Sequence, residues 1–201
     1  LDSRNNCNAI IETATNTILL GSNKTKIPED VTAVETGAFI SCYYMESLNV
    51  PANLTSIPFG AFSGCRNLKS IVVDKNNTVY DSRNNCNAVI ETATDILIHG
   101  CMNTMIPEDV VCIGHYAVYQ CLGLEEIVIP DAVHTIGDEA FAGCNHLRTI
   151  TLGNGLKSIG NYPFGNNNYY GRPTTTINTI VFKGSVPPAV KDLYSLGFNN
   201  I

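Results

Sequence analysis

The chain has 201 residues and a formal net charge of −6, with 44% apolar and 15% charged residues. This balance is typical of a globular protein and excludes a disordered chain. The acidity and the lack of a basic stripe argue against nucleic-acid binding, and no apolar run approaches the ~20 residues that cross a bilayer.

The first residues belong to a motif that returns later in the chain. Asp2–Thr15 and Asp81–Thr94 differ at one position, and Pro28–Val31 recurs as Pro107–Val110, again 79 residues further on. Such an offset predicts a large duplicated unit. Because Leu1 stands inside the motif, we expect the chain to begin within a longer gene product, with any signal or anchor sequence outside this segment.

Each copy of the motif contains two short apolar stretches joined by a polar turn. They are Asn8–Glu12 and Thr17–Leu20 in the first copy, and Asn87–Glu91 and Ile96–His99 in the second. Two such stretches with a short connection predict a β-hairpin.

The segments after each hairpin repeat with a period of 23 residues, starting at Pro28, Pro51, Pro107 and Pro130. Five columns keep their register through the repeats: Val34, Ile57, Ile113, Ile136 and Ile159; Phe39, Phe62, Val118, Phe141 and Phe164; Cys42, Cys65, Cys121 and Cys144; Met45, Leu68, Leu124 and Leu147; and Leu48, Ile71, Ile127 and Ile150. One coil cannot bury its own apolar side, so we expect successive coils to stack around a shared core.

Each coil combines a strand pattern with a polar segment. Leu147–Leu152 predicts a strand in which Thr149 and Thr151 face solvent, because side chains alternate between the two faces of a strand. Asp138–Cys144 has the length of one helical turn, with an aspartate to cap its start and Gly143 to end it.

The spacing of these residues resembles a known repeat signature. Ile136–Leu147 follows the pattern Ile-Gly-x-x-Ala-Phe-x-x-Cys-x-x-Leu of the BspA-like leucine-rich repeats of bacterial surface proteins; Ile57–Leu68, with Pro for Gly, and Ile113–Leu124, with Val118 for Phe, follow it too. The resemblance covers nearly the whole chain. It implies a leucine-rich-repeat solenoid, a β-rich α/β fold of short parallel strands and one-turn helices. Hairpin insertions of this kind are expected to project from the stack or to widen it locally.

These patterns predict a single solenoid over residues 1–201. Its parts are a hairpin coil (1–27), two repeats (28–73), a second hairpin coil (74–106), two repeats (107–152), an irregular repeat (153–182) and a C-terminal cap (183–201). The irregular repeat has Pro163 and Asn167 in place of Ala and Cys, and a polar loop follows. The strand Ile177–Phe182 then ends the repeat, and we expect Ile177, Ile180 and Phe182 to face inward.

The eight cysteines are interpreted as structural. Four form a repeat column facing the core, where cysteine behaves as a small apolar residue. The alternative is a disulfide between Cys42 and Cys65 or between Cys121 and Cys144; the column spacing permits it, but parallel side chains in register seldom offer the required dihedral angle. No Cys-x-x-Cys pair occurs, so the usual spacing of a zinc site is missing.

Other chemical motifs are weak. Asp81–Asn87 resembles part of a calcium loop, but Arg83 takes a position that needs an oxygen ligand, and Asn and Asp are also ordinary turn residues. His99 and Cys101 lie close in sequence without the third group that orients a nucleophile pair. We therefore predict no enzyme activity, no metal site and no cofactor.

The outward strand positions and one loop are the candidate protein-binding residues. They are Ser47, Asn49, Lys69, Ser70, Val72, Glu126, Val128, Arg148, Thr149, Thr151, Tyr169 and Tyr170. Solenoids offer long repeated surfaces to partners, and tyrosines act as interface anchors. The alternative is a solvated sheet face whose β-branched residues serve strand formation, with the tyrosines packed on the core.

The resemblance implies a non-catalytic protein-binding or adhesion module, located at the bacterial cell surface or secreted. Its ligand would be an unidentified protein or glycoprotein, such as one of the host extracellular matrix, with no nucleic-acid partner and no direct membrane insertion. One alternative function is a structural spacer within a larger surface protein, and another is a hydrolase. A binding module loses affinity when the outward residues are replaced, whereas a spacer tolerates these changes.

Overall fold

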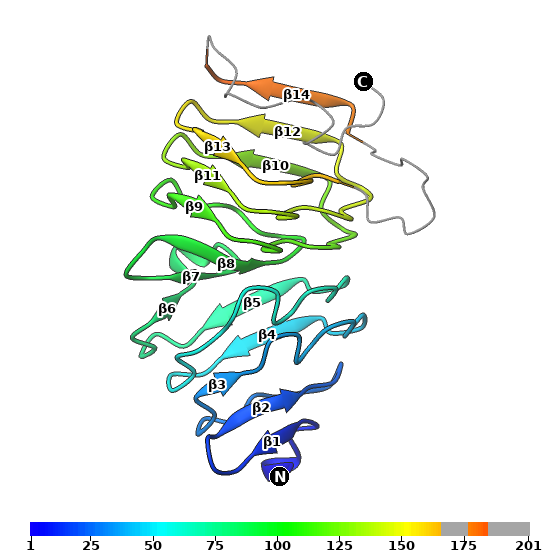
Figure 1. The fold of residues 1–201 in the computed structure, drawn as a ribbon, viewed down its shortest axis with the longest axis vertical. Coiled ribbons are helices and arrows are strands. Elements are labelled where there is room, and N and C mark those ends of the chain that lie inside the picture. The colour runs from blue at the N-terminus through cyan, green and yellow to red at the C-terminus, as the bar shows by residue number, and fades with distance from the viewer. Residues whose placement is uncertain (166–176, 185–201) are drawn as a thin grey trace.

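The computed structural model describes residues 1–165 and 177–184. Within these ranges the chain forms an elongated stack of coils with the N-terminus at one end (Figure 1). The strands are β1 (Ile10–Glu12), β2 (Thr17–Leu20), β3 (Ala33–Val34), β4 (Ser47–Val50), β5 (Ser70–Val73), β6 (Tyr80–Asp81), β7 (Ala88–Glu91), β8 (Ile96–Gly100), β9 (Cys112–Ile113), β10 (Glu126–Ile129), β11 (Thr135–Ile136), β12 (Thr149–Leu152), β13 (Ser158–Ile159) and β14 (Thr179–Phe182). Two short 3-10 turns cover Arg4–Asn6 and Arg83–Asn85. The predicted solenoid is confirmed.

The described strands form four sheets whose order follows the stacking of the coils. The orders are β1-β2-β3, β4-β5, β13-β11-β9-β8-β7-β6 and β10-β12-β14. β4 pairs with β5, and β10 with β12, in parallel and without a register shift. In β12 burial alternates as predicted, so Ile150 and Leu152 are buried while Thr149 and Thr151 are half-buried.

The core is built from the predicted columns. The rings of Phe39 and Phe62 stack with centroids 4.8 Å apart, and those of Phe141 and Phe164 with centroids 5.4 Å apart. Like side chains one coil apart thus pack on one another, as a solenoid requires.

The cysteine column is buried, as predicted. The Cys65 thiol donates to the carbonyl of Phe39 at 3.5 Å, and the Cys144 thiol to that of Val118 at 3.0 Å. Burial raises the pKa of both thiols to about 12. All eight cysteines carry free thiols.

The hairpins form where the sequence predicts them, but the second one does not project. β7 and β8 pair with each other in antiparallel orientation, and β8 also pairs in parallel with β9. The hairpin therefore lies within the stack (Figure 1). Ala88 and Ile90 face one apolar core, whereas Val89 faces another. The hairpin is therefore an internal wall that is buried on both sides.

The predicted one-turn helix at Asp138–Cys144 is wrong. The segment forms successive turns instead, with Glu139 and Gly143 at positive φ. The N–H groups of Glu139, Phe141 and Gly143 donate to carbonyls of the next coil at 2.7–2.9 Å. Because alternate donors serve the neighbouring coil, they are not free to close helical hydrogen bonds. The Asp138 carboxylate likewise accepts from Asn161 of the next coil, at 2.6 Å, rather than capping a helix.

The last described strand is less enclosed than predicted. Ile177 and Ile180 pack against the core, but Phe182 is 39% exposed, although it pairs in register with Leu152. The polar loop and the C-terminal cap lie almost wholly outside the described residues.

Candidate protein-binding face

The outward side chains of five strands form two columns. In the β4-β5 sheet Ser47 is paired with Ser70, and Asn49 with Val72. In the β10-β12-β14 sheet the registers align Glu126, Thr149 and Thr179 in one row and Val128, Thr151 and Val181 in the next. We call these outward residues the strand face. The observed strand pairing therefore places the outward residues of the five strands in rows.

One column of the strand face holds three exposed valines, together with Asn49 of β4 and Thr151 of β12. Val72 is 51% exposed, Val128 49% and Val181 43%. Valine has few rotamers, so its side chain loses little entropy when a partner covers it. This column could form the dry centre of a protein interface.

A segment of the hairpin coil separates the two sheets of the strand face. The backbone N–H of Met102 donates to the carbonyl of Leu68 at 3.1 Å, and the side-chain amide of Asn103 donates to that of Lys69 at 2.9 Å. Beyond this segment lies a groove of about 730 Å³. Its lining includes Met102–Ile106 on one side and Leu124, Glu126–Val128 and Pro130 on the other. Met105, at its rim, is 65% exposed. The sequence did not predict this groove, because it depends on how the hairpin coil meets β10.

Charged residues flank the rows. Lys69 forms an exposed ion pair with Glu46, with 2.8 Å between Nζ and Oε1, and this hydrogen bond lowers the pKa of Glu46. Arg148, Glu125 and Glu126 border a second, more polar hollow of about 480 Å³ that shares Met102 with the groove. The face thus combines exposed valines with a charged border, and an apolar centre with a polar rim is the usual layout of a protein interface.

The repeat type is decided by comparison with known proteins. The model of the BspA type leucine rich repeat region matches residues 8–94 and 99–186, in six copies. The chain belongs to this family. No curated protein matches it.

Solved structures resemble this BspA-type chain. A leucine-rich repeat protein from Eubacterium ventriosum is 23% identical with a TM-score of 0.62, over 77% of this chain and 46% of its own. A leucine rich cell surface protein from Faecalibacterium prausnitzii is 23% identical with a TM-score of 0.49, over 77% and 34%. The pneumococcal vaccine antigen PcpA is 15% identical with a TM-score of 0.49, over 81% and 47%. The first likeness supports the fold, and this chain spans less than half the length of each.

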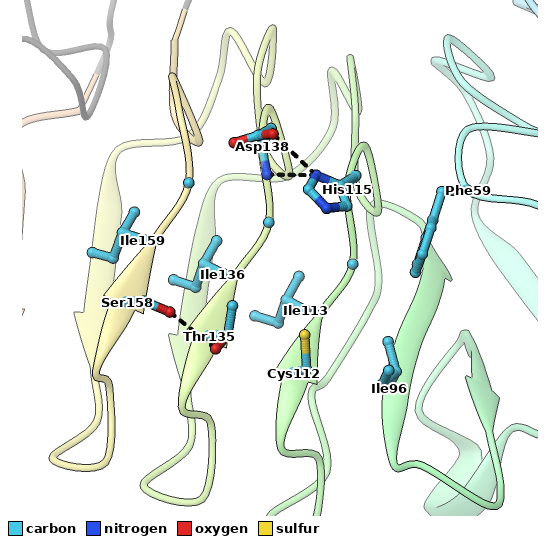
Figure 2. A pocket seen from close by; sticks show the side chains of 13 residues that line it. Phe59, Ile96, Cys112, Ile113, His115, Thr135, Ile136, Asp138, Ser158 and Ile159 are labelled. Carbon is cyan, nitrogen blue, oxygen red and sulfur yellow. Dashed lines mark hydrogen bonds and ion pairs between the residues drawn. The ribbon is translucent and has the colours of Figure 1, made fainter.

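A further hollow, of about 400 Å³, lies along the short strands of the BspA-type coils (Figure 2). Its polar side chains pair between neighbouring coils. His115 Nδ1 accepts from the backbone N–H of Asp138 at 3.0 Å, and the hydroxyls of Thr135 and Ser158 lie 3.0 Å apart. Phe59 lies at one end, with its ring 5.7 Å from that of His115 and at 76° to it (Figure 2). One signal of this hollow is visible in the sequence, a glycine repeated at Gly114, Gly137 and Gly160.

The calcium-like motif holds an arginine at its centre. Arg83 binds the carboxylates of Asp81, Asp95 and Asp109 at 2.6–2.8 Å. Burial alone would raise the pKa of Asp81, but hydrogen bonds from Arg83 and Thr92 together lower it. The guanidinium of Arg83 thus supplies the positive charge that pairs with these three carboxylates. Residues 1–165 and 177–184 contain no cluster of three or more His, Cys, Asp or Glu side chains suited to a metal ion.

The remaining predictions from the sequence concern two tyrosines, one histidine and membrane insertion. Tyr169 and Tyr170 lie outside the described residues. His99, considered for a nucleophile pair, is buried, and neither ring nitrogen has a hydrogen-bond partner in the described part of the chain. No helix in that same part is long and apolar enough to cross a membrane.

Proposed function

We propose that this chain is a non-catalytic protein-binding module, acting at the bacterial cell surface or in secreted form, and that it binds through the strand face. The observation that carries the proposal is the groove at Met102–Ile106, which Val128 lines, with two further exposed valines, Val72 and Val181, on the same face. A groove lined by apolar side chains and flanked by polar groups is a common site of interaction.

The layout of the face favours a protein partner. Val72 and Val128 supply apolar contact area, while Glu126, Lys69 and Arg148 supply the charged border that steers a partner and sets its register. Tyr169 and Tyr170 belong to the same proposal as additional anchors. The partner we propose is a protein or glycoprotein, such as one of the host extracellular matrix.

Membership of the BspA-type family supports a surface or secreted location, because the family resemblance implies adhesion. That support is by analogy with the fold and not from a bound ligand. The alternative, a spacer that holds other domains away from the cell envelope, requires no conserved chemistry on the strand face.

The experiment compares binding of the native chain and two valine variants to immobilised host matrix proteins and to bacterial surface fractions. Val128→Glu places a charge in the lining of the groove, and we expect at least a tenfold loss of affinity for whichever protein binds. Val111→Glu is the matched control, since Val111 is 36% exposed and precedes β9, away from the strand face. Equal affinity of the Val128→Glu variant and the native chain would contradict the proposal and favour the spacer.

A further inference from the structure

The N-terminal hairpin leaves one face uncovered. Ile10 and Leu20 are paired across β1 and β2, and they are 42% and 53% exposed. On the opposite face Ile11 and Ile18 are fully buried in the core. We call the outward side of β1 and β2 the hairpin face. An apolar sheet face of this kind normally lies against another layer.

The internal copy of this hairpin shows what covers the equivalent face. Ile10 and Leu20 correspond to Val89 and His99 across the 79-residue offset. Val89 is fully buried, and His99 is 4% exposed. The ring of His99 lies 5.3 Å from that of Phe62, which belongs to the preceding coil. In the internal copy, therefore, a repeat coil occupies the face.

Hydrogen bonds fix the register of that coil on the internal hairpin. The N–H of Val73 donates to the hydroxyl of Ser82 at 3.1 Å, and the N–H of Met102 donates to the carbonyl of Leu68 at 3.1 Å. Both attachment points exist in the N-terminal copy. Ser3 stands at the place of Ser82, and the backbone N–H of Asn23 stands at the place of Met102.

We propose that the hairpin face is a seat for one further repeat coil, stacked as residues 51–79 stack on the internal hairpin. The coil would place an aromatic side chain, equivalent to Phe62, over Leu20. Its aliphatic side chains would cover Ile10. With Leu20 in place of His99, the seat is more apolar than its internal counterpart. The inference concerns a different surface from the strand face and does not depend on the proposed function.

The test is a tandem chain in which residues 1–79 precede the full sequence, so that Val79 joins Leu1 as it joins Tyr80 in the native chain. Ile10→Cys in the second copy provides a thiol whose rate of alkylation reports how well the face is covered. We expect alkylation in the tandem to be on the order of a hundredfold slower than for Ile10→Cys in the 201-residue chain, because only local opening would expose it.

Two controls make the outcome decisive. Ile40→Cys in the second copy probes a position that is 63% exposed in a neighbouring coil, and its rate should be the same in both chains. A tandem whose second copy carries residues 96–103 in place of residues 17–24 reproduces the internal junction and shows that the tandem folds. Protection in this control but not with the native residues would overturn the proposal, as would protection in neither.

Concentration-dependent protection of Ile10→Cys in the 201-residue chain alone would also overturn it. That result would show that a second copy of the chain covers the face, and sedimentation would then report a dimer.

Discussion

His99 is a polar side chain in a column of rings. Its ring lies 5.3 Å from that of Phe62, tilted by 39°, and its nitrogens lack partners among the residues that the structure describes. Burial lowers the pKa of His99 from 6.5 to about 4. The folded state therefore holds the imidazole neutral at a pH where the unfolded chain takes up a proton.

This difference predicts a loss of stability in acid. Above pH 6.5 both states are neutral at His99, and its contribution does not change with pH. As the pH falls from 6.5 to about 4, only the unfolded state binds the proton, so the free energy of unfolding falls by about 3 kcal/mol. Urea titrations between pH 7 and pH 4 measure this fall.

His99→Leu is the matched variant, because Leu20 stands at the same place in the N-terminal copy. Carboxylates titrate in both proteins, so the informative quantity is the difference between the two curves. The variant should lack the part of the fall that belongs to the imidazole. Parallel curves for the native chain and the variant would contradict the prediction.

At the residue scale, the apolar columns could be predicted from the sequence, whereas the partners of the charged side chains could not. The sequence already showed that Arg83 occupies a ligand position of the calcium-loop pattern, where arginine cannot bind a cation. Its pairing with Asp95 and Asp109 was not visible, because Asp109 lies 26 residues away and is brought close only by the stacking of the coils. Local spacing carries no information about such contacts.

At the scale of elements, the strands could be predicted and the turns could not. The period-2 burial of β10 and β12 follows from alternating apolar residues. The turn segments depend instead on hydrogen bonds between coils, which no local pattern reveals. The continuous apolar runs of β7 and β8 were an available sign of a strand buried on both faces. The predicted strand-face rows needed only this alternation, whereas the groove beside Met105 needed the full packing.

Close contact between neighbouring turns predicts a sharp contrast between two glycines. A Cβ at Gly137 would lie 2.6 Å from the backbone nitrogen of His115, whereas a Cβ at Gly37 would meet nothing nearer than 3.9 Å. Gly37 has a φ of +71°. Gly37→Ala should therefore lower the free energy of unfolding only by the strain of a left-handed alanine backbone, about 1 kcal/mol. Gly137→Ala must push two coils apart and should lower the free energy of unfolding by about 2–3 kcal/mol.

Chemical denaturation of the two alanine variants measures both values. The order is the critical result, because helix or strand propensity treats the two substitutions alike. Equal losses, or a larger loss for Gly37→Ala, would show that the coils at Gly137 yield more easily than their contacts indicate.

For the whole molecule, the two buried clusters meet at the β7-β8 wall. One contains Phe39 and Phe62, and the other contains Phe141 and Phe164. In a solenoid each coil is stabilised mainly by its neighbours, so damage in one cluster should spread incompletely to the other. The sequence predicted one continuous core, and the division arises because side chains of the wall alternate between its two sides.

Phe141→Ala tests this division. Removing a fully enclosed ring should lower the stability of its own cluster by about 3–5 kcal/mol. Amide hydrogen exchange should accelerate most in residues 107–164, and much less in residues 28–73. Phe62→Ala is the reciprocal variant and should reverse the pattern. Uniform acceleration through the chain in both variants would mean that the wall transmits unfolding and does not limit it.

The near-identity of Asp2–Thr15 and Asp81–Thr94 gives the wall an evolutionary consequence. Recombination between two such stretches in a gene would add or delete one complete compartment, hairpin included. Every new junction would join a repeat coil to the same first strand of a hairpin, so the length of the molecule could change in whole steps of 79 residues.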